Sequence, residues 1–102
     1  MERKSHLLIN SIITNYFISK NRFNIVCLSS NECDYKNPFY IFYRDVEIAL
    51  SLLNQEEKMI IENEYFLHLS DSWWKPYFKE KTFLHKKEKA IGKFVRLFHE
   101  IH

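Results

Sequence analysis

The chain contains a single glycine and two prolines among its 102 residues, and this scarcity constrains its fold more than any other feature. Antiparallel sheets rely on tight turns that place glycine where the backbone adopts a positive φ. No Asn-Gly or Asp-Gly pair, the usual hairpin turn, occurs in the sequence. Core-forming side chains are nevertheless plentiful, since 46% of the residues are hydrophobic and 17% are aromatic. We therefore predict a small all-α protein in which long helices are joined by short polar turns.

The length and the cysteine content predict one intracellular domain. A chain of 102 residues suffices for one compact domain with a modest core, so we expect residues 1–102 to form a single unit. Its two cysteines, Cys27 and Cys33, have neither the number of a disulfide scaffold nor the spacing of a zinc clip. No segment reads as a signal peptide or reaches the length of a membrane span. We expect a cytoplasmic protein with no membrane partner.

Apolar residues at helical spacing predict the first elements. The first helix is expected over residues 6–19, with Ser5 as its N-cap. Residues 20–37 favour a loop, with or without one strand-like piece. Asn37-Pro38 is a typical helix start, and a second helix is expected from there to about residue 53.

Three closely spaced helices are predicted after residue 53. Asn54 and Glu57 form an approximate capping box for a third helix that runs to about Leu67. A short fourth helix is expected over residues 72–78. After a polar turn, a fifth helix over residues 82–101 has the clearest apolar face, made of Phe83, Ala90, Ile91, Phe94, Phe98 and Ile101. About five helices are thus expected, divided between residues 1–52 and a helix-turn-helix-like unit over residues 53–102.

Charge is distributed unevenly along the chain. The total is only +2, but residues 1–29 carry +3, residues 30–72 carry −6 and residues 73–102 carry +5. A basic terminal segment attracts phosphates or acidic protein surfaces, whereas the acidic middle repels phosphates. The acidic middle has two interpretations: it steadies the fold against the basic helix, or it docks a basic surface of a partner.

The last three predicted helices resemble region 4 of bacterial sigma factors. More closely, they resemble the ArpU-like regulators of Firmicutes and their phages, together with a family of small uncharacterised mollicute proteins. The resemblance covers about half of the chain and is sharpest over residues 82–94. The residues that carry it are Ala49, Leu50, Leu53, Glu56, Glu57, Ile60, Ile61, Tyr65, Phe66, Trp73, Trp74, Tyr77, Phe78, Thr82, Phe83, His85, Lys86, Lys87, Glu88, Lys89, Ala90 and Phe94. The resemblance implies a transcription regulator whose last helix enters the major groove of duplex DNA.

The residues themselves support DNA affinity more than DNA specificity. With the apolar face turned inward, the candidate nucleic-acid contacts lie at the helix start or on its flanking and outer positions: Lys81, Thr82, His85, Lys86, Lys89 and Lys93. Lysine suits phosphate contacts, whereas base reading more often uses Arg, Asn or Gln, of which this helix has only Arg96. A solvated surface or an acidic protein partner are the alternatives for the same lysines.

Trp73 and Trp74 are the candidate partner-binding residues. Neighbouring residues on a helix diverge by about 100°, so one tryptophan is expected in the core and the other on the surface. An exposed tryptophan would stack on a base or anchor a protein contact, although aromatic residues in small helical domains are more often core. The alternative function is thus an adaptor with little DNA affinity that docks on RNA polymerase or another partner through these residues and the acidic middle. In either case residues 1–52 would cover the helix-turn-helix or form a homodimer interface.

Enzymatic chemistry has no support in the sequence. It contains no glycine-rich phosphate loop, nucleophile elbow or HExxH motif. The five histidines form no recognisable ligand set. We expect no catalytic residues, no metal and no cofactor.

Overall fold

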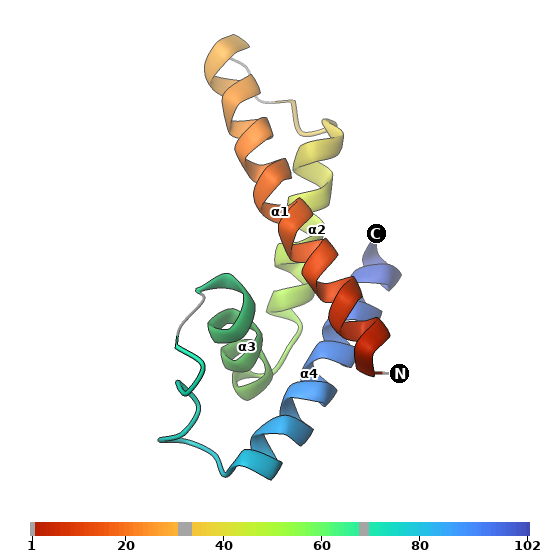
Figure 1. The fold of residues 1–102 in the computed structure, drawn as a ribbon. Coiled ribbons are helices and arrows are strands. Elements are labelled where there is room, and N and C mark those ends of the chain that lie inside the picture. The colour runs from red at the N-terminus through yellow and green to blue at the C-terminus, as the bar shows by residue number, and fades with distance from the viewer. Residues whose placement is uncertain (1, 31–33, 68–69) are drawn as a thin grey trace.

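The structure, a computed structural model, describes residues 2–30, 34–67 and 70–102. It contains four α-helices, α1 (Glu2–Ser30), α2 (Pro38–Ser51), α3 (Gln55–Ile61) and α4 (Glu80–Ile101), and a π-helical segment η1 (Glu62–Phe66) (Figure 1). No strand occurs in these ranges. The all-α prediction is confirmed, but the count is four helices in place of five.

Helix α1 corrects the prediction for the first third of the chain. The helix begins at Glu2, ahead of the expected cap at Ser5, and continues through residues 20–30, where a loop or strand-like piece was predicted. Phe23 explains the continuation, because its ring is buried against Tyr40 and Tyr43 of α2 at centroid distances of 5.1 and 5.8 Å. Packing against α2 outweighs the weaker helix preference of the partly β-branched run 23–28.

The predicted starts of α2 and α3 are confirmed by their capping hydrogen bonds. The Asn37 side chain accepts a bond of 2.8 Å from the Phe39 amide, ahead of Pro38 in the first turn. At α3, Asn54 accepts from the Glu57 amide at 2.8 Å, and the Glu57 carboxylate accepts from the Asn54 amide at 2.9 Å. This reciprocal capping box satisfies two amides that would otherwise lack partners in the first turn.

The connection between α3 and α4 differs from the sequence prediction. Helix α3 passes into η1, which ends where the Leu67 amide donates to the Glu62 carbonyl, five residues back, at 2.8 Å. The fourth helix predicted over residues 72–78 is replaced by consecutive turns over residues 71–77. Pro76 has no amide hydrogen for the bond back to Ser72 that an α-helix requires. Helix α4 then starts at Glu80, two residues earlier than expected.

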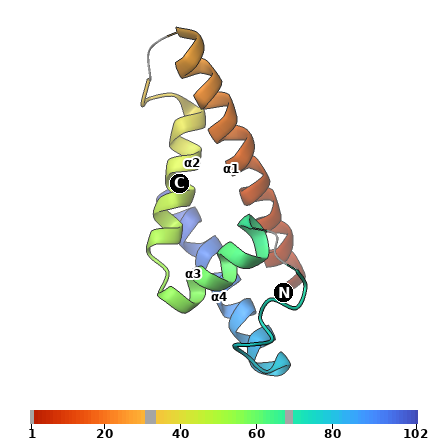
Figure 2. The same cartoon turned by 90° about the vertical axis from the view of Figure 1, so that its left-hand side faces the viewer.

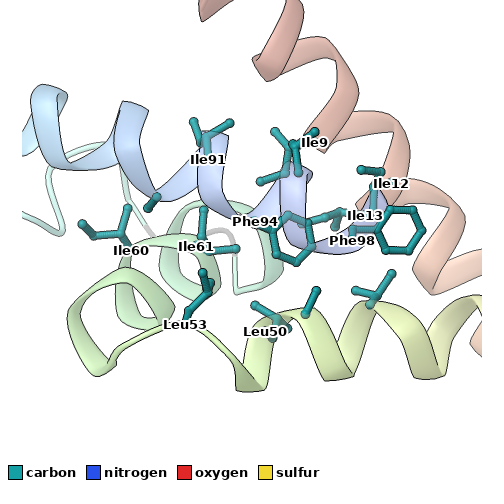
Figure 3. Close-up of a cluster of buried hydrophobic side chains, with 14 of the residues drawn as sticks. Ile9, Ile12, Ile13, Leu50, Leu53, Ile60, Ile61, Ile91, Phe94 and Phe98 are labelled. Atoms are coloured by element: carbon teal, nitrogen blue, oxygen red, sulfur yellow. The ribbon is translucent and has the colours of Figure 1, made fainter. Parts of the chain in front are cut away.

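One hydrophobic core joins all four helices, and Figure 3 shows the side chains of α1, α2, α3 and α4 that meet in it. Phe94 of α4 is fully buried, as are Ile9 of α1 and Ile61 of α3. The buried residues of α4 are Phe83, Ala90, Ile91, Phe94, Val95 and Phe98. This set matches the predicted apolar face closely and fixes which side of α4 faces away from the protein.

The far end of α4 is held against α2 by a buried carboxylate. Asp45 is 2% exposed, and its Oδ2 lies 2.9 Å from Nδ1 of His102, just past the end of α4. Its Oδ1 accepts a 3.0 Å bond from the Arg44 guanidinium. Because the two ends of α4 are fixed, at Asp45 and through Phe83, the helix has a defined rotation relative to the core.

The molecule is elongated, with extents of 49 × 27 × 22 Å. The outer half of the α1–α2 hairpin projects away from α3 and α4 in both views (Figures 1 and 2). We call this part the arm and define it as residues 18–30 of α1 with residues 38–41 of α2. None of the described helices combines the length and apolar character needed to cross a membrane.

Candidate nucleic-acid interface

The first turns of α4 carry most of the cationic side chains that the sequence predicted as nucleic-acid contacts. Helix α4 begins after Lys79, and the first intrahelical bond runs from the Phe83 amide to the Lys79 carbonyl at 2.8 Å. Phe83 is 2% exposed and points into the core. Residues four apart lie on one face of a helix, so Lys81, His85 and Lys89 form a single exposed row.

This row borders an open groove between the beginnings of α3 and α4. The groove has a volume of about 440 Å³. Of the six candidate nucleic-acid contacts, the structure brings five together along it, and only Lys93 lies outside. The groove is lined by Asn54, Glu56, Glu57, Ile60, Lys81, Thr82, His85, Lys86 and Lys89.

Two of the candidate lysines are paired with carboxylates at the start of α3. Lys86 Nζ lies 2.6 Å from Glu56 Oε1, and Lys93 Nζ lies 3.0 Å from Glu57 Oε1. The partners are 30 and 36 residues apart in sequence, so only the packing of α3 against α4 brings them together. These pairs correspond to the interpretation in which the acidic middle steadies the fold.

Glu57 combines the capping bond with the ion pair. Burial alone would raise the pKa of Glu57. The amide of Asn54 and the ammonium of Lys93 outweigh that effect and hold the pKa below its ordinary value. Glu57 is therefore ionised at neutral pH, and a carboxylate lies directly beside the groove.

Lys87, on the inner side of α4, is engaged by η1. Its Nζ lies 2.7 Å from Glu64 Oε2, with both side chains less than one-fifth exposed. It also lies 5.9 Å above the ring centre of Tyr65. Burial, with a smaller contribution from Glu64, raises the pKa of Tyr65 to about 12. Lys87 thus contributes to packing and not to the exposed row.

The two tryptophans anchor the turns ahead of α4. Trp73 is 9% exposed and donates its indole hydrogen to Glu64 Oε1 at 2.7 Å. Trp74 is half-buried and stacks on Phe83, with ring centres 4.9 Å apart and planes 8° from parallel. The aromatic side chain that this segment exposes is Tyr77, at 66%. Nothing in the sequence distinguished Tyr77 from the tryptophans as the outward residue.

The cationic side chains without a carboxylate partner are those available to bind an anion at this surface. In the described ranges, no acidic side chain lies within ion-pair distance of Lys81 or Lys89. Farther along α4, Arg96 is 3.8 Å from Glu100, and both are largely exposed. Exposed Glu88 also interrupts the positive surface. The result is a short row of free cations with acidic neighbours, which suits a few phosphate contacts.

The part of the chain that the structure describes contains no cluster of three metal-ligating side chains. Comparison of the chain with models of protein families, with curated proteins and with solved structures gave no match. The resemblance to the ArpU-like and sigma-region-4 proteins therefore rests on the residues quoted for it.

Proposed function

We propose that the protein binds duplex DNA through phosphate contacts made by the exposed row on α4, and that it acts in transcription regulation. In this proposal α3, the turns and α4 form a degenerate helix-turn-helix of the sigma-region-4 kind. The observation that carries it is the row of Lys81, His85 and Lys89, which is exposed and has no carboxylate partner among the described residues.

The spacing of the row suits a phosphate backbone. Residues 81 and 89 are eight positions apart, which corresponds to about 12 Å along a helix. Each lysine that neutralises a phosphate releases condensed counterions, and this release is the main source of non-specific affinity. Backbone amides in the first turn of α4, next to Thr82, add a favourable potential for an anion.

The first turns of α4 lack the residue types that most often read bases. Among the exposed residues of the first three turns of α4 there is no Arg, Asn or Gln. Glu56 and Glu57 limit the number of phosphates that can approach the groove. We therefore expect binding that is insensitive to sequence, with a dissociation constant of roughly 10⁻⁴–10⁻⁶ M at physiological salt.

The experiment is a salt titration of duplex binding, followed by fluorescence anisotropy, with the double variant Lys81→Gln/Lys89→Gln. Each lost phosphate contact reduces the slope of log affinity against log salt by about 0.9, so the double variant should flatten the slope by about 1.8. Lys36→Gln/Lys58→Gln is the matched control, because it removes the same two charges from exposed sites outside the groove.

Equal slopes for the double variant and the wild type would contradict the proposal. So would an equal loss of affinity in Lys36→Gln/Lys58→Gln, because the loss would then follow from the net charge alone. Far-UV circular dichroism of each variant checks that the helices are retained.

The alternative function is an adaptor for RNA polymerase or another protein, and exposed Tyr77 and Leu67 favour it more than the two tryptophans do. Tyr77 and Leu67 are 66% and 62% exposed in the connection between η1 and α4, and exposed aromatic residues are frequent anchors of protein contacts. An adaptor of this kind would retain purified RNA polymerase on immobilised protein, and Tyr77→Ala would abolish that retention. Retention that survives Tyr77→Ala would count against it.

A further inference from the structure

Helix α1 carries an exposed apolar stripe on the side facing away from the hydrophobic core, in addition to the apolar face that it buries in that core. Its members are spaced alternately by four and three residues, the repeat that keeps a seam on one side of a helix. The stripe is Leu7, Ser11, Thr14, Ile18, Asn21, Ile25 and Leu28, and every member is exposed. The four apolar members are between 46% and 83% exposed. The buried residues of α1, such as Ile9, Tyr16 and Phe23, lie on the other side.

The stripe contains no charged residue. Between residues 5 and 31 the chain has only two charged side chains, Lys20 and Arg22, and neither belongs to the stripe. A helix face in contact with water normally carries charged residues, whereas the centres of protein interfaces are depleted of them. The polar members, Ser11, Thr14 and Asn21, each carry both a hydrogen-bond donor and an acceptor, so each can pair with a copy of itself.

The arm carries four of the seven stripe residues: Ile18, Asn21, Ile25 and Leu28. A groove of about 450 Å³ lies beside it, lined by Asn21, Arg22, Ile25, Val26 and Phe39. Figures 1 and 2 show that α3 and α4 leave this part of the hairpin uncovered. Two helices without a third layer leave apolar surface in water, and pairing two such hairpins into a bundle buries it.

The surface area indicates how much is left uncovered. The accessible surface is 7010 Å², whereas a compact monomer of 12.5 kDa exposes roughly 6200 Å². The excess of roughly 800 Å² matches the area that each partner contributes to a standard protein interface. The radius of gyration, 15.1 Å, likewise exceeds the value of about 13 Å typical of this length.

We propose that the stripe on α1 is the interface of a homodimer, in which the occupant is the same stripe of a second copy. The excess area is that of one interface. A two-fold interface uses the same patch on both copies, so the patch must be complementary to itself, as an uncharged stripe of apolar and hydrogen-bonding residues is. A partner recognised by charge would need charged residues here. The proposal concerns α1 alone and does not rest on DNA binding by α4.

Sedimentation equilibrium of the full chain tests this directly. We expect a mass twice the 12.5 kDa of one chain. Ile25→Glu should shift the protein to the monomer, because it places a charge on an apolar residue of the stripe. The matched control is Leu52→Glu: Leu52 is 54% exposed, close to the 53% of Ile25, but lies outside the stripe. The control should remain dimeric.

A second variant should strengthen the self-association that Ile25→Glu is expected to abolish. Asn21→Leu replaces a polar seam residue by the residue preferred at such positions, so it should tighten self-association at least tenfold. This variant guards against a misleading result from a poorly folded Ile25→Glu protein. A wild-type chain that sediments at 12.5 kDa at all concentrations would overturn the proposal. So would Ile25→Glu remaining dimeric, or Asn21→Leu failing to tighten the association.

Discussion

At the scale of single residues, three lysines within one turn of α4 have three different environments. Lys86 is paired with Glu56, Lys87 is partly buried against Glu64, and Lys89 is exposed without a carboxylate partner in the described ranges. An exposed ion pair contributes little to stability, at most about 1 kcal/mol, so the pair of Lys86 can exchange its carboxylate for a phosphate. The number of phosphates that α4 can contact therefore depends on the environment of each lysine and not on the number of lysines.

Glu56→Gln should therefore increase DNA affinity. The substitution frees Lys86 completely and removes a negative charge from the groove, so the salt slope should steepen by up to about 0.9. Anisotropy titrations of both proteins against one duplex measure the change. Glu62→Gln is the control, because Glu62 lines a separate surface beside Tyr16. Unchanged or weaker binding by Glu56→Gln would contradict the role given to this groove.

The lowered pKa of Glu57 should make the stability of the fold depend on pH in the acid range. Its pKa is below the ordinary value of 4.5, so its stabilising effect is complete above that pH and is lost as the pH falls through the lowered pKa. The melting temperature of the wild type should therefore fall more steeply below pH 4.5 than that of Glu57→Gln, which is less stable at neutral pH. Parallel curves for the two proteins would show that Glu57 contributes nothing to the pH dependence.

At the scale of elements, the sequence predicted the helices whose signals are local. The caps at Asn37 and Asn54 and the apolar face of α4 are encoded within a few residues, and all three are present. The extension of α1 depends on Phe23 meeting Tyr40 and Tyr43, a contact between distant parts of the chain. The ion pairs of Lys86 and Lys93 could not be predicted for the same reason, because their glutamate partners lie on another helix, α3.

The middle of α4 contains one local defect that can be tested. Gly92 is exposed in the helix interior, and a Cβ atom added there would meet nothing within 4 Å. Gly92→Ala should stabilise the protein by about 1 kcal/mol, since glycine costs that much in a helix. For a chain of this size the melting temperature should rise by roughly 4–8 °C. A fall in the melting temperature, measured by circular dichroism, would mean that α4 is not continuous at this position.

At the scale of the whole molecule, the two candidate surfaces lie on different elements. The exposed row is at the beginning of α4, whereas the arm projects from the opposite end of the molecule (Figure 1). The core between them includes Ile9, Ile61 and Phe94 from three different helices. Substitutions on the arm and on the row are therefore far enough apart for their effects to add independently.

The most direct test of the central claim is the salt dependence of wild-type binding to duplex DNA. Two to three phosphate contacts, from Lys81, Lys89 and a cation released from its pair, predict a slope of about −2 to −3 in log affinity against log salt. The slope should be the same for unrelated duplex sequences. Absence of binding at low salt, or an affinity that does not change with salt, would contradict the account.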